Sequence, residues 1–225
     1  MEFVIRAATP EDAPAIAAVA VAVWPEEPLD VAAIAALIAT TERGALVAER
    51  DGMVAGFVDS FLTQAGDGAA RWEVDLIAVA PGTQGYGVGR ALVRASMAGA
   101  RAVGAARARA LIRVGNIASE RAFTACGFAP DLWESELWAV ADRDVGTASA
   151  GLHIVPVQTF RYAGVWLEEV TAAGLQSLQP SAGVGVVAGT VIPLTERDTI
   201  DAAVSAELQP AGHFRFWHCA VSAAD

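Results

Sequence analysis

Apolar residues recur with two different periods along this chain, and the changes of period predict where its elements lie. Alternation bounded by turn residues is typical of strands, whereas apolar positions three or four residues apart are typical of helices. Up to residue 140 the pattern predicts strands at residues 3–7, 45–49, 54–61, 72–79, 108–114 and 132–140. It predicts helices at residues 10–24, 29–40, 87–103 and 119–125. Strands and helices therefore alternate over most of this segment.

The pattern changes after residues 141–150, ADRDVGTASA, whose composition is typical of a linker. Beyond it we expect strands at residues 152–161, 183–192 and 213–221, a short helix at 164–173 and a helix at 196–208. These boundaries divide the chain into residues 1–142 and a small α+β domain of unknown role at residues 151–225. Roughly 75 residues are few for an independent core, so we expect this domain to pack on the first one or on a second subunit. It could be a degenerate half-copy of the first domain, although it has no glycine-rich loop.

The strongest chemical signal is a glycine-rich turn between the strand at 72–79 and the helix at 87–103. Its residues are Gln84-Gly85-Tyr86-Gly87-Val88-Gly89. A turn that opens a helix presents N–H groups without helical partners, and the positive end of the helix dipole adds to their attraction for a phosphate. Glycines also let a diphosphate approach closely, since no Cβ stands in the way. The turn therefore predicts a ligand that carries phosphate.

Two familiar phosphate-binding loops do not fit these residues. A Walker-type loop has Lys followed by Ser or Thr after its last glycine, but Gly89 is followed by Arg90 and Ala91. A dinucleotide fingerprint spaces its glycines as Gly-x-Gly-x-x-Gly and has an acidic residue about twenty positions on, whereas the region near residues 107–109 is basic.

What remains is Gln-x-x-Gly-x-Gly after an apolar strand, formed here by Gln84, Gly87 and Gly89. This pattern resembles the acetyl-CoA-binding signature of the GNAT (Gcn5-related) N-acetyltransferases. A second stretch strengthens the resemblance, because the next strand is followed by Asn116, a helix and then Gly127-Phe128, in the order that the family keeps. The resemblance covers about residues 1–142 and does not extend into the last third of the chain.

The resemblance implies a GNAT acyl-CoA N-acyltransferase fold, which is a mixed α/β sheet that splays open to admit pantetheine, with a small C-terminal α+β appendage. It implies acetyl-CoA as co-substrate. A backbone N–H near Val79 would polarise the thioester carbonyl, and Asn116 would either bond the pantetheine arm or cap the helix that follows. The residues that we expect at the cofactor are Ile77, Ala78, Val79, Gln84, Gly85, Tyr86, Gly87, Val88, Gly89, Arg90, Asn116, Ser119 and Phe123.

Two acidic residues are the candidates for catalysis, because the attacking amine must lose a proton. Glu73 and Asp75 lie on the strand beside the loop, and alternation places both on one face. A glutamate at the position of Glu73 is the general base in the family's histone-acetylating branch. The alternative is that Glu73 is an ion-pair partner of Arg71 or of an arginine on another strand.

One departure from the family pattern concerns the general acid. Many members carry a tyrosine where this chain has Phe123, and phenylalanine has no proton to give to the leaving thiolate. Tyr86 and Ser119 are the nearest substitutes.

Composition and charge restrict the function further. The formal net charge is −11, whereas a nucleic-acid binder normally has a basic face. The two cysteines suggest reduced thiols, and neither they nor the three histidines show metal-ligand spacing. The apolar stretch at residues 13–24 is too short to span a bilayer, and the acids before it do not suit an export signal. We therefore expect a cytoplasmic protein that binds neither membrane nor nucleic acid.

These observations predict an N-acetyltransferase that moves an acetyl group from acetyl-CoA to a primary amine of an unidentified small molecule or peptide, by direct transfer and without a metal. A catalytically weak or inactive acyl-CoA-binding sensor is the alternative. A structural or oligomerisation protein would rest on the last third of the chain alone. A homodimer is left open as the assembly.

Overall fold

The computed structural model describes residues 2–40, 43–144, 152–180 and 186–221. Its strands are β1 (Val4–Ala7), β2 (Leu46–Arg50), β3 (Met53–Gln64), β4 (Ala70–Val79), β5 (Arg107–Arg113), β6 (Ala129–Pro130), β7 (Ser135–Asp144), β8 (His153–Gln158), β9 (Ala163–Glu168), β10 (Gln179–Pro180), β11 (Val186–Pro193) and β12 (Gln209–Ala220). Its helices are α1 (Ala13–Val23), α2 (Val31–Ile38), α3 (Val88–Ala102), α4 (Ile117–Thr124), α5 (Ala172–Gln176) and α6 (Arg197–Ser205). Short 3₁₀ turns precede α1 (Pro10–Asp12) and follow β4 (Pro81–Thr83).

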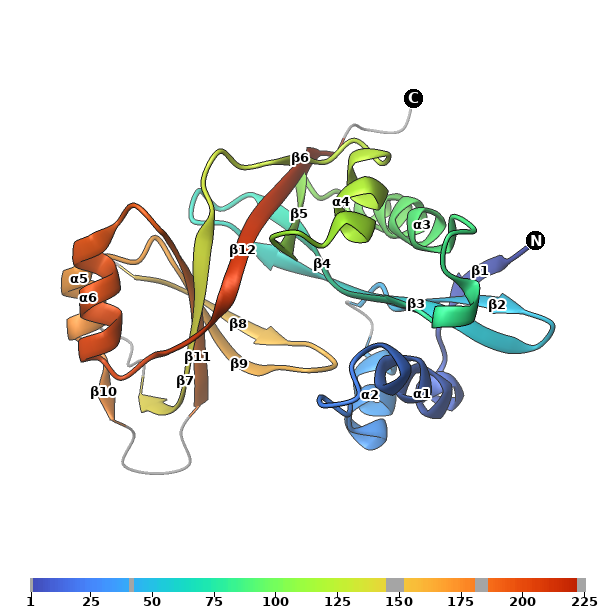
Figure 1. Cartoon of the computed structure of the whole chain (residues 1–225), viewed down its shortest axis with the longest axis horizontal. Coiled ribbons are helices and arrows are strands. Elements are labelled where there is room, and N and C mark those ends of the chain that lie inside the picture. The colour runs from blue at the N-terminus through green and yellow to red at the C-terminus, as the bar shows by residue number, and fades with distance from the viewer. Residues whose placement is uncertain (1, 41–42, 145–151, 181–185, 222–225) are drawn as a thin grey trace.

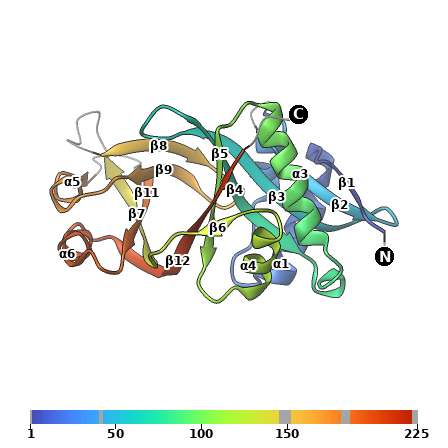
Figure 2. The ribbon, with the colours of Figure 1, turned by 90° about the horizontal axis from the view of Figure 1, so that it is seen from above.

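One mixed sheet runs through the whole molecule, in the order β1-β2-β3-β4-β5-β12-β7-β11-β9-β8. The pairs β4–β5 and β11–β9 are parallel, and the other neighbours are antiparallel. In Figure 1, α3 and α4 lie above the strands of the first segment, while α1 and α2 lie below them. The view from above shows α3 and α4 in front of the sheet (Figure 2). The mixed α/β fold predicted from the sequence is therefore confirmed.

Three apolar clusters form the core. The first lies between α3 and the sheet and includes Leu92, Val93 and Trp72. The second joins α1 and α2 to the other face, around Ile16 and Phe57. The third fills the second segment beneath α5 and α6. Helices thus cover both faces of the first segment's strands, because each helix buries its apolar side against them.

The second segment repeats the element order of the first in shortened form. A hairpin, a crossover helix, a parallel strand, a further helix and a last strand occur as β3-β4-α3-β5-α4-β7 and again as β8-β9-α5-β11-α6-β12. The ends of α4 and α6 match in detail. The N–H of Phe128 donates to Phe123 O at 3.1 Å, and the N–H of Leu208 donates to Ala203 O at 3.0 Å. This order supports the view of the second segment as a degenerate half-copy.

The two halves exchange their last strands. Strand β12 of the second half pairs with β5 of the first, from Phe214 opposite Arg113 to Ala220 opposite Arg107. Strand β7 of the first half pairs with β11 of the second. Figure 1 shows β12 running between β5 and β7. The division into residues 1–142 and 151–225 stays a prediction, but the sheet itself crosses that boundary.

A bulge and a parting of strands shape the centre of the first half. The β3–β4 ladder pairs Asp59 with Leu76 and Ser60 with Val74, so Asp75 is an extra residue on β4. The parallel β4–β5 ladder holds only from Arg71 to Glu73. Beyond Glu73, β4 continues without β5 beside it in this ladder, which leaves an opening between the two strands.

Two expectations about the second segment were wrong. The helix expected at 164–173 is instead strand β9, followed by the short helix α5. Its backbone groups find ladder partners on both β8 and β11, and this pairing overrides the helical spacing of Trp166, Leu167 and Val170. The linker expected at 141–150 begins too early, since β7 continues to Asp144; residues 145–150 lie outside the described part.

Within the described residues, no helix is both long enough and apolar enough to cross a membrane.

Candidate active site

The glycine-rich turn has the conformation that an anion-binding helix start requires. Gly85 and Gly87 have φ values of +83° and +82°, a region in which glycine is the usual residue. Gly87 is the N-cap of α3, so the first N–H groups of that helix have no acceptor within it. The Gln84 side chain steadies the turn, because its Nε2 donates to the carbonyl oxygen of Val79 at 3.0 Å.

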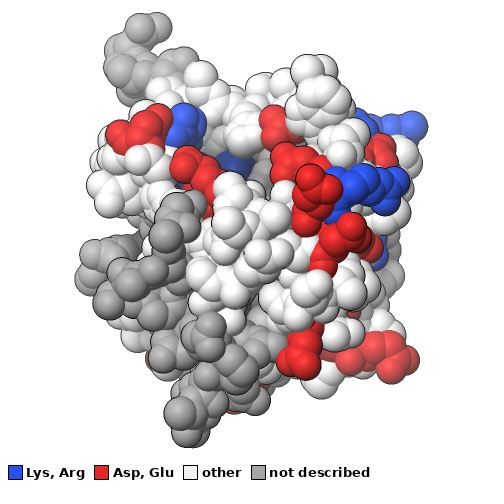
Figure 3. Space-filling model, turned by 90° about the vertical axis from the view of Figure 1, so that its left-hand side faces the viewer, with Lys and Arg blue, Asp and Glu red and all other residues white. Residues whose placement is uncertain are grey.

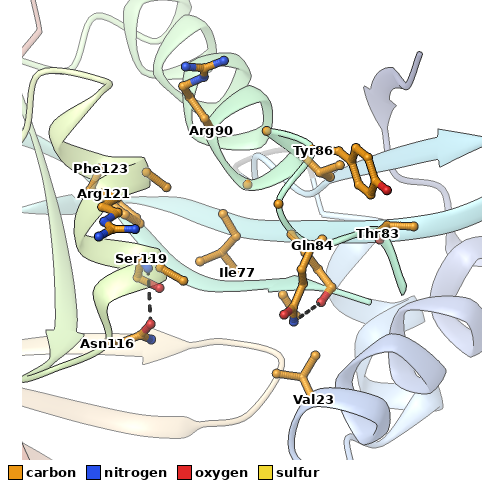
Figure 4. A pocket seen from close by; sticks show the side chains of 18 of the residues that line it. Val23, Ile77, Thr83, Gln84, Tyr86, Arg90, Asn116, Ser119, Arg121 and Phe123 are labelled. Atoms are coloured by element: carbon orange, nitrogen blue, oxygen red, sulfur yellow. Dashed lines mark hydrogen bonds between the residues drawn. The ribbon is translucent and has the colours of Figure 1, made fainter. Parts of the chain in front are cut away.

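A cavity of about 760 Å³ lies in front of this turn. Figure 4 shows it between the start of α3, the end of β4 and the helix α4. Every residue that the sequence predicted for cofactor binding lines it: Ile77, Ala78, Val79, Gln84, Gly85, Tyr86, Gly87, Val88, Gly89, Arg90, Asn116, Ser119 and Phe123. The structure therefore brings together two sequence motifs that are about thirty positions apart.

Three of these residues have further structural roles. Asn116 caps α4, because its Oδ1 accepts from the N–H of Ser119 at 3.2 Å. Phe123 is buried and meets Phe128 edge to face, with ring centroids 5.0 Å apart. The Tyr86 ring is 57% exposed and lies on the side of the loop away from α4, so it is poorly placed to replace a phenol at Phe123 (Figure 4).

Sequence reasoning missed several residues of this cavity. Arg121 of α4 lines it, and Val23 and Trp24 reach it from the end of α1 (Figure 4). The position of Arg121 within a recognisable helix was a usable signal. The approach of α1 depends on tertiary packing and left no signal in the sequence.

Glu73 lies in a buried ion-pair cluster. Its Oε1 accepts from Arg71 Nε at 2.6 Å and from Arg109 Nη2 at 2.9 Å. The Thr63 hydroxyl donates to the same oxygen at 2.7 Å, and Arg109 Nε donates to Oε2 at 3.0 Å. The structure thus gives Glu73 the ion-pair partners of the alternative interpretation.

Glu168 from β9 completes the cluster. It accepts from Arg71 Nη2 at 2.6 Å and lies 2.7 Å from Arg109 Nη2. The two arginines hold the pKa of Glu168 below its usual value, although burial alone would raise it. Two arginines therefore balance two carboxylates across the junction of the halves.

Asp75 has a different environment from Glu73. Asp75 is exposed at the wall of a small cavity of about 70 Å³, whereas Glu73 is buried. Burial, followed by the negative charges of Asp59 and Glu73, raises the pKa of Asp75 to about 7; hydrogen bonding with Thr159 and the charge of Arg43 oppose the rise. No ion pair joins Asp75 to an arginine in the described part of the chain.

The two cavities share strand β4. Residues 73–75 border the small cavity, and residues 77–79 border the large one. At roughly 3.3 Å per strand residue, Asp75 and Ile77 are roughly 7 Å apart along β4. The carboxylate of Asp75 in the small cavity therefore lies close to the large cavity.

Comparison with known proteins agrees with this geometry. The model of the acetyltransferase (GNAT) family matches residues 8–128, more than half of the 225 residues. The fold and the loop define an acyl-CoA-dependent transferase, and this match places the chain in the GNAT family of acetyltransferases. No curated protein matches the chain.

Solved structures show how far the likeness extends. A GCN5-related N-acetyltransferase from Sphaerobacter thermophilus is similar over 99% of this chain and 97% of its own, with a TM-score of 0.61 and 15% identity, which shows the shared fold. A ribosomal-protein-alanine N-acetyltransferase from Brucella melitensis covers 59% of this chain and 88% of its own, with a TM-score of 0.52 and 28% identity. A Salmonella typhimurium structure with its cofactor acetyl-CoA covers 59% and 83%, with a TM-score of 0.51 and 27% identity.

Acetyl-CoA is the co-substrate of this family. The residues of this chain fit it. A Cβ built on Gly85 would have nothing within 4 Å, and one on Gly89 would touch only Val79 at 3.8 Å, so the backbone faces open space as a diphosphate cradle requires. Arg90 and Arg121 line the same cavity and bring positive charge to it.

Proposed function

We propose that this protein transfers the acetyl group of acetyl-CoA directly to a primary amine, with Asp75 as the proton acceptor. The observation that carries the proposal is the cavity that joins the turn at the start of α3 to the parting of β4 and β5. A location in the cytoplasm and a homodimeric assembly stay predictions from the sequence.

The chain's backbone would hold the phosphates and the acyl group. The N–H groups at the start of α3 and the dipole of that helix favour a diphosphate at Gly85–Gly89. The edge of β4 beyond Glu73 has no ladder with β5, which supports a role for N–H groups near Val79 in polarising a carbonyl. When bound, acetyl-CoA supplies the thioester that the amine attacks.

Asp75 suits proton transfer better than Glu73. The oxygens of Glu73 already accept hydrogen bonds from Arg71, Arg109 and Thr63, which leaves little room for a substrate amine to reach them. A pKa of Asp75 near 7 matches a base that works near neutral pH. We therefore assign Glu73 to positioning β4 and β5, and the proton transfer to Asp75.

The proposed step balances as follows. Asp75 takes a proton from the bound ammonium, and the free amine attacks the carbonyl carbon while the bond from that carbon to the CoA sulfur breaks. The nitrogen loses its second proton to water as the amide forms, and the leaving thiolate gains a proton from water, because Phe123 has none to give. Asp75 then returns its proton to water. One proton is released overall.

Thiol release from acetyl-CoA, measured with a panel of primary amines, tests the proposed function. We expect saturable release that depends on the amine, and an acetylated amine detected by mass spectrometry. Tight binding of acetyl-CoA without release for any amine would contradict the transferase and favour the sensor that lacks the acid at Phe123.

A further inference from the structure

We infer that the β8–β9 hairpin of the second half completes the acceptor site, and that this site takes a compact apolar monoamine without a carboxylate beside its nitrogen. The inference rests on the proposed acetyl transfer, since it identifies the amine. It also gives the second half a role in choosing the substrate.

The small cavity is built from both halves. The first half supplies Phe61, Asp75 and Leu111, and the second supplies residues of three strands. Those residues are Val155 and Val157 of β8, Trp166 of β9 and Phe216 of β12. In Figure 1, β8 and β9 lie beneath β4, on the side of α1 and α2 and away from α3. The amine would therefore approach from the face of the sheet that the hairpin covers.

The hairpin is fixed at its tip. The N–H of Phe160 donates to Asp59 at 3.3 Å, and the Phe160 ring packs against Phe57 with centroids 6.1 Å apart. Arg161 pairs with Glu27 at 2.8 Å and lies 4.6 Å over the Trp24 ring. These four contacts hold the tip of the β8–β9 hairpin in place against the first half.

The far end of the hairpin is fixed as well. Glu168, the last residue of β9, is bound by Arg71 and Arg109 of the first half. Trp166 is two residues earlier on the same strand, so its ring is held over the cavity between the two anchored ends.

The charges around the cavity select a cation. Glu73 and Glu168 are balanced by Arg71 and Arg109, and Asp59 is paired with Arg43. This leaves Asp75 as the negative charge that an ammonium group would neutralise. Phe61 and Phe216 already have Arg43 and Arg109 over their rings, so Trp166 is the lining ring that would favour an ammonium group further.

The same charges reject a carboxylate. Both arginines near the cavity already bind two carboxylates each, so neither is free to pair with an acid on the ligand. A carboxylate on the carbon next to the nitrogen would lie beside Asp75 and Glu73 and lose its hydration without compensation.

The size and lining of the cavity define the rest of the amine. A volume of about 70 Å³ is several times the roughly 10–15 Å³ that one water molecule needs in such a cavity, which is enough for an aminomethyl head and a short branch. The lining beyond Asp75 is mostly valine, leucine and aromatic side chains, and its polar members Thr63 and Arg109 are already bonded to Glu73. A short aliphatic chain therefore fits, whereas a second charge or a bulky group at the first carbon does not.

Matched amines test the inference directly. Isobutylamine and valine share one skeleton and differ by the carboxylate, as do isopentylamine and leucine. With acetyl-CoA present, we expect kcat/KM for each monoamine to exceed that of its amino acid by at least about 10-fold, since one unpaired buried charge costs more than 1.4 kcal/mol. Equal or higher values for the amino acids would overturn the inference while leaving the acetyl transfer established.

Two variants connect this selectivity to the hairpin. Val157→Phe adds bulk to the cavity without removing packing, and Trp166→Ala removes one wall. We expect both to weaken isobutylamine binding to the protein–CoA complex at least 10-fold in calorimetry, while CoA itself binds normally. Trp133→Ala is the control, because this tryptophan is 58% exposed and does not line the cavity. It should change neither the binding of isobutylamine nor that of CoA.

These variants also separate the two proposals. If no amine is acetylated, the proposed transfer fails, but selective binding of isobutylamine to the CoA complex, lost in Val157→Phe, would still support the amine site. Unchanged amine binding in both hairpin variants would overturn the inference whatever the activity.

Discussion

At the scale of single residues, two carboxylates two positions apart on one strand have opposite environments. Glu73 is held by arginines from β4 and β5, whereas Asp75 is the extra residue of a bulge and borders a cavity. The difference follows from neighbours on other strands. Because of this difference, Glu73 anchors neighbouring strands, whereas we propose that Asp75 exchanges a proton.

The raised pKa of Asp75 predicts a particular dependence of stability on pH. In the unfolded chain Asp75 has a pKa near 3.9, and in the folded protein about 7. Between these values the folded protein binds the proton and the unfolded chain does not, so this group lowers the free energy of unfolding as pH rises from about 4 to 7. Asp75→Asn cannot ionise, so the variant should melt at a higher temperature than the wild type at pH 8.

Thermal unfolding of both proteins at pH 4, 6 and 8 checks this expectation. The difference in melting temperature should be largest at pH 8 and shrink toward pH 4. A constant difference at all three values would mean that Asp75 does not titrate in this range.

Some residue roles were readable from the sequence and others were not. The cap formed by Asn116 and the pairing of Glu73 with Arg71 are local, so spacing along the chain offered both as alternatives to a direct role at the cofactor or in catalysis. Glu168 and Thr159 reach the site only because the second half folds back on the first. The hydrophobic periodicity of the sequence cannot predict contacts between residues so far apart along the chain.

At the scale of elements, the loop and helix α3 form the central unit of the site. The loop brings Gly87, with its left-handed φ, to the N-cap position, and the apolar face of α3 fixes the helix on the sheet. Sequence predicted this unit because a glycine-rich turn between a strand and a helix has few alternatives.

A pair of glycine substitutions separates binding from backbone strain. Gly87 and Gly104 lie near the two ends of α3, with φ of +82° and +69°. Alanine at either position should cost a similar strain of about 1–2 kcal/mol. Only Gly87→Ala should also place a methyl group where the diphosphate binds.

Calorimetric titration with acetyl-CoA gives the readout for this pair. We expect Gly87→Ala to weaken binding at least 10-fold and Gly104→Ala to leave it unchanged, with similar losses of stability in both. Equal affinities in the two variants would remove the loop from the binding site.

Elements were predicted less well where pairing is non-local. Strands β2, β4 and β5 and helix α3 lie within a few residues of their predicted bounds. Strand β9 was predicted as a helix, because a short apolar stretch with Trp166 and Leu167 fits the period of a helix as well as that of a strand. Its pairing with β8 and β11 makes it a strand in the folded protein.

At the scale of the whole molecule, the exchange of β7 and β12 makes one sheet from two unequal halves. This arrangement places the hairpin of the smaller half over the site of the larger one. Asp and Glu side chains are visible in several places on the end formed by α5 and α6 (Figure 3). Together with a net charge of −11, they would attract cationic amines over a distance.

The buried ion pairs between the halves predict a large effect of one substitution. Glu168→Ala leaves Arg71 and Arg109 with a single carboxylate in a buried setting, which should cost about 3 kcal/mol. Glu49→Ala removes one carboxylate from Arg6, which is more exposed and keeps Asp12, and should cost no more than about 1 kcal/mol.

The free energy of unfolding in urea compares the two variants. Similar small losses in both would mean that the ion pairs of Glu168 add little to the strand exchange and apolar packing that join the halves. The sequence could not have predicted this junction, since Arg71 and Glu168 are 97 residues apart and belong to segments joined by a strand exchange.

The most direct test of the account is the dependence of kcat/KM on pH for acetyl transfer to isobutylamine, measured for the wild type and Asp75→Asn. Asparagine keeps the shape and removes the proton acceptor, so activity near pH 7.5 should fall by about 100-fold or more. The deficit should narrow toward pH 10, because the amine then loses its proton without help. A variant that keeps wild-type activity at pH 7.5, or one whose deficit is the same at every pH, would contradict Asp75 as the proton acceptor.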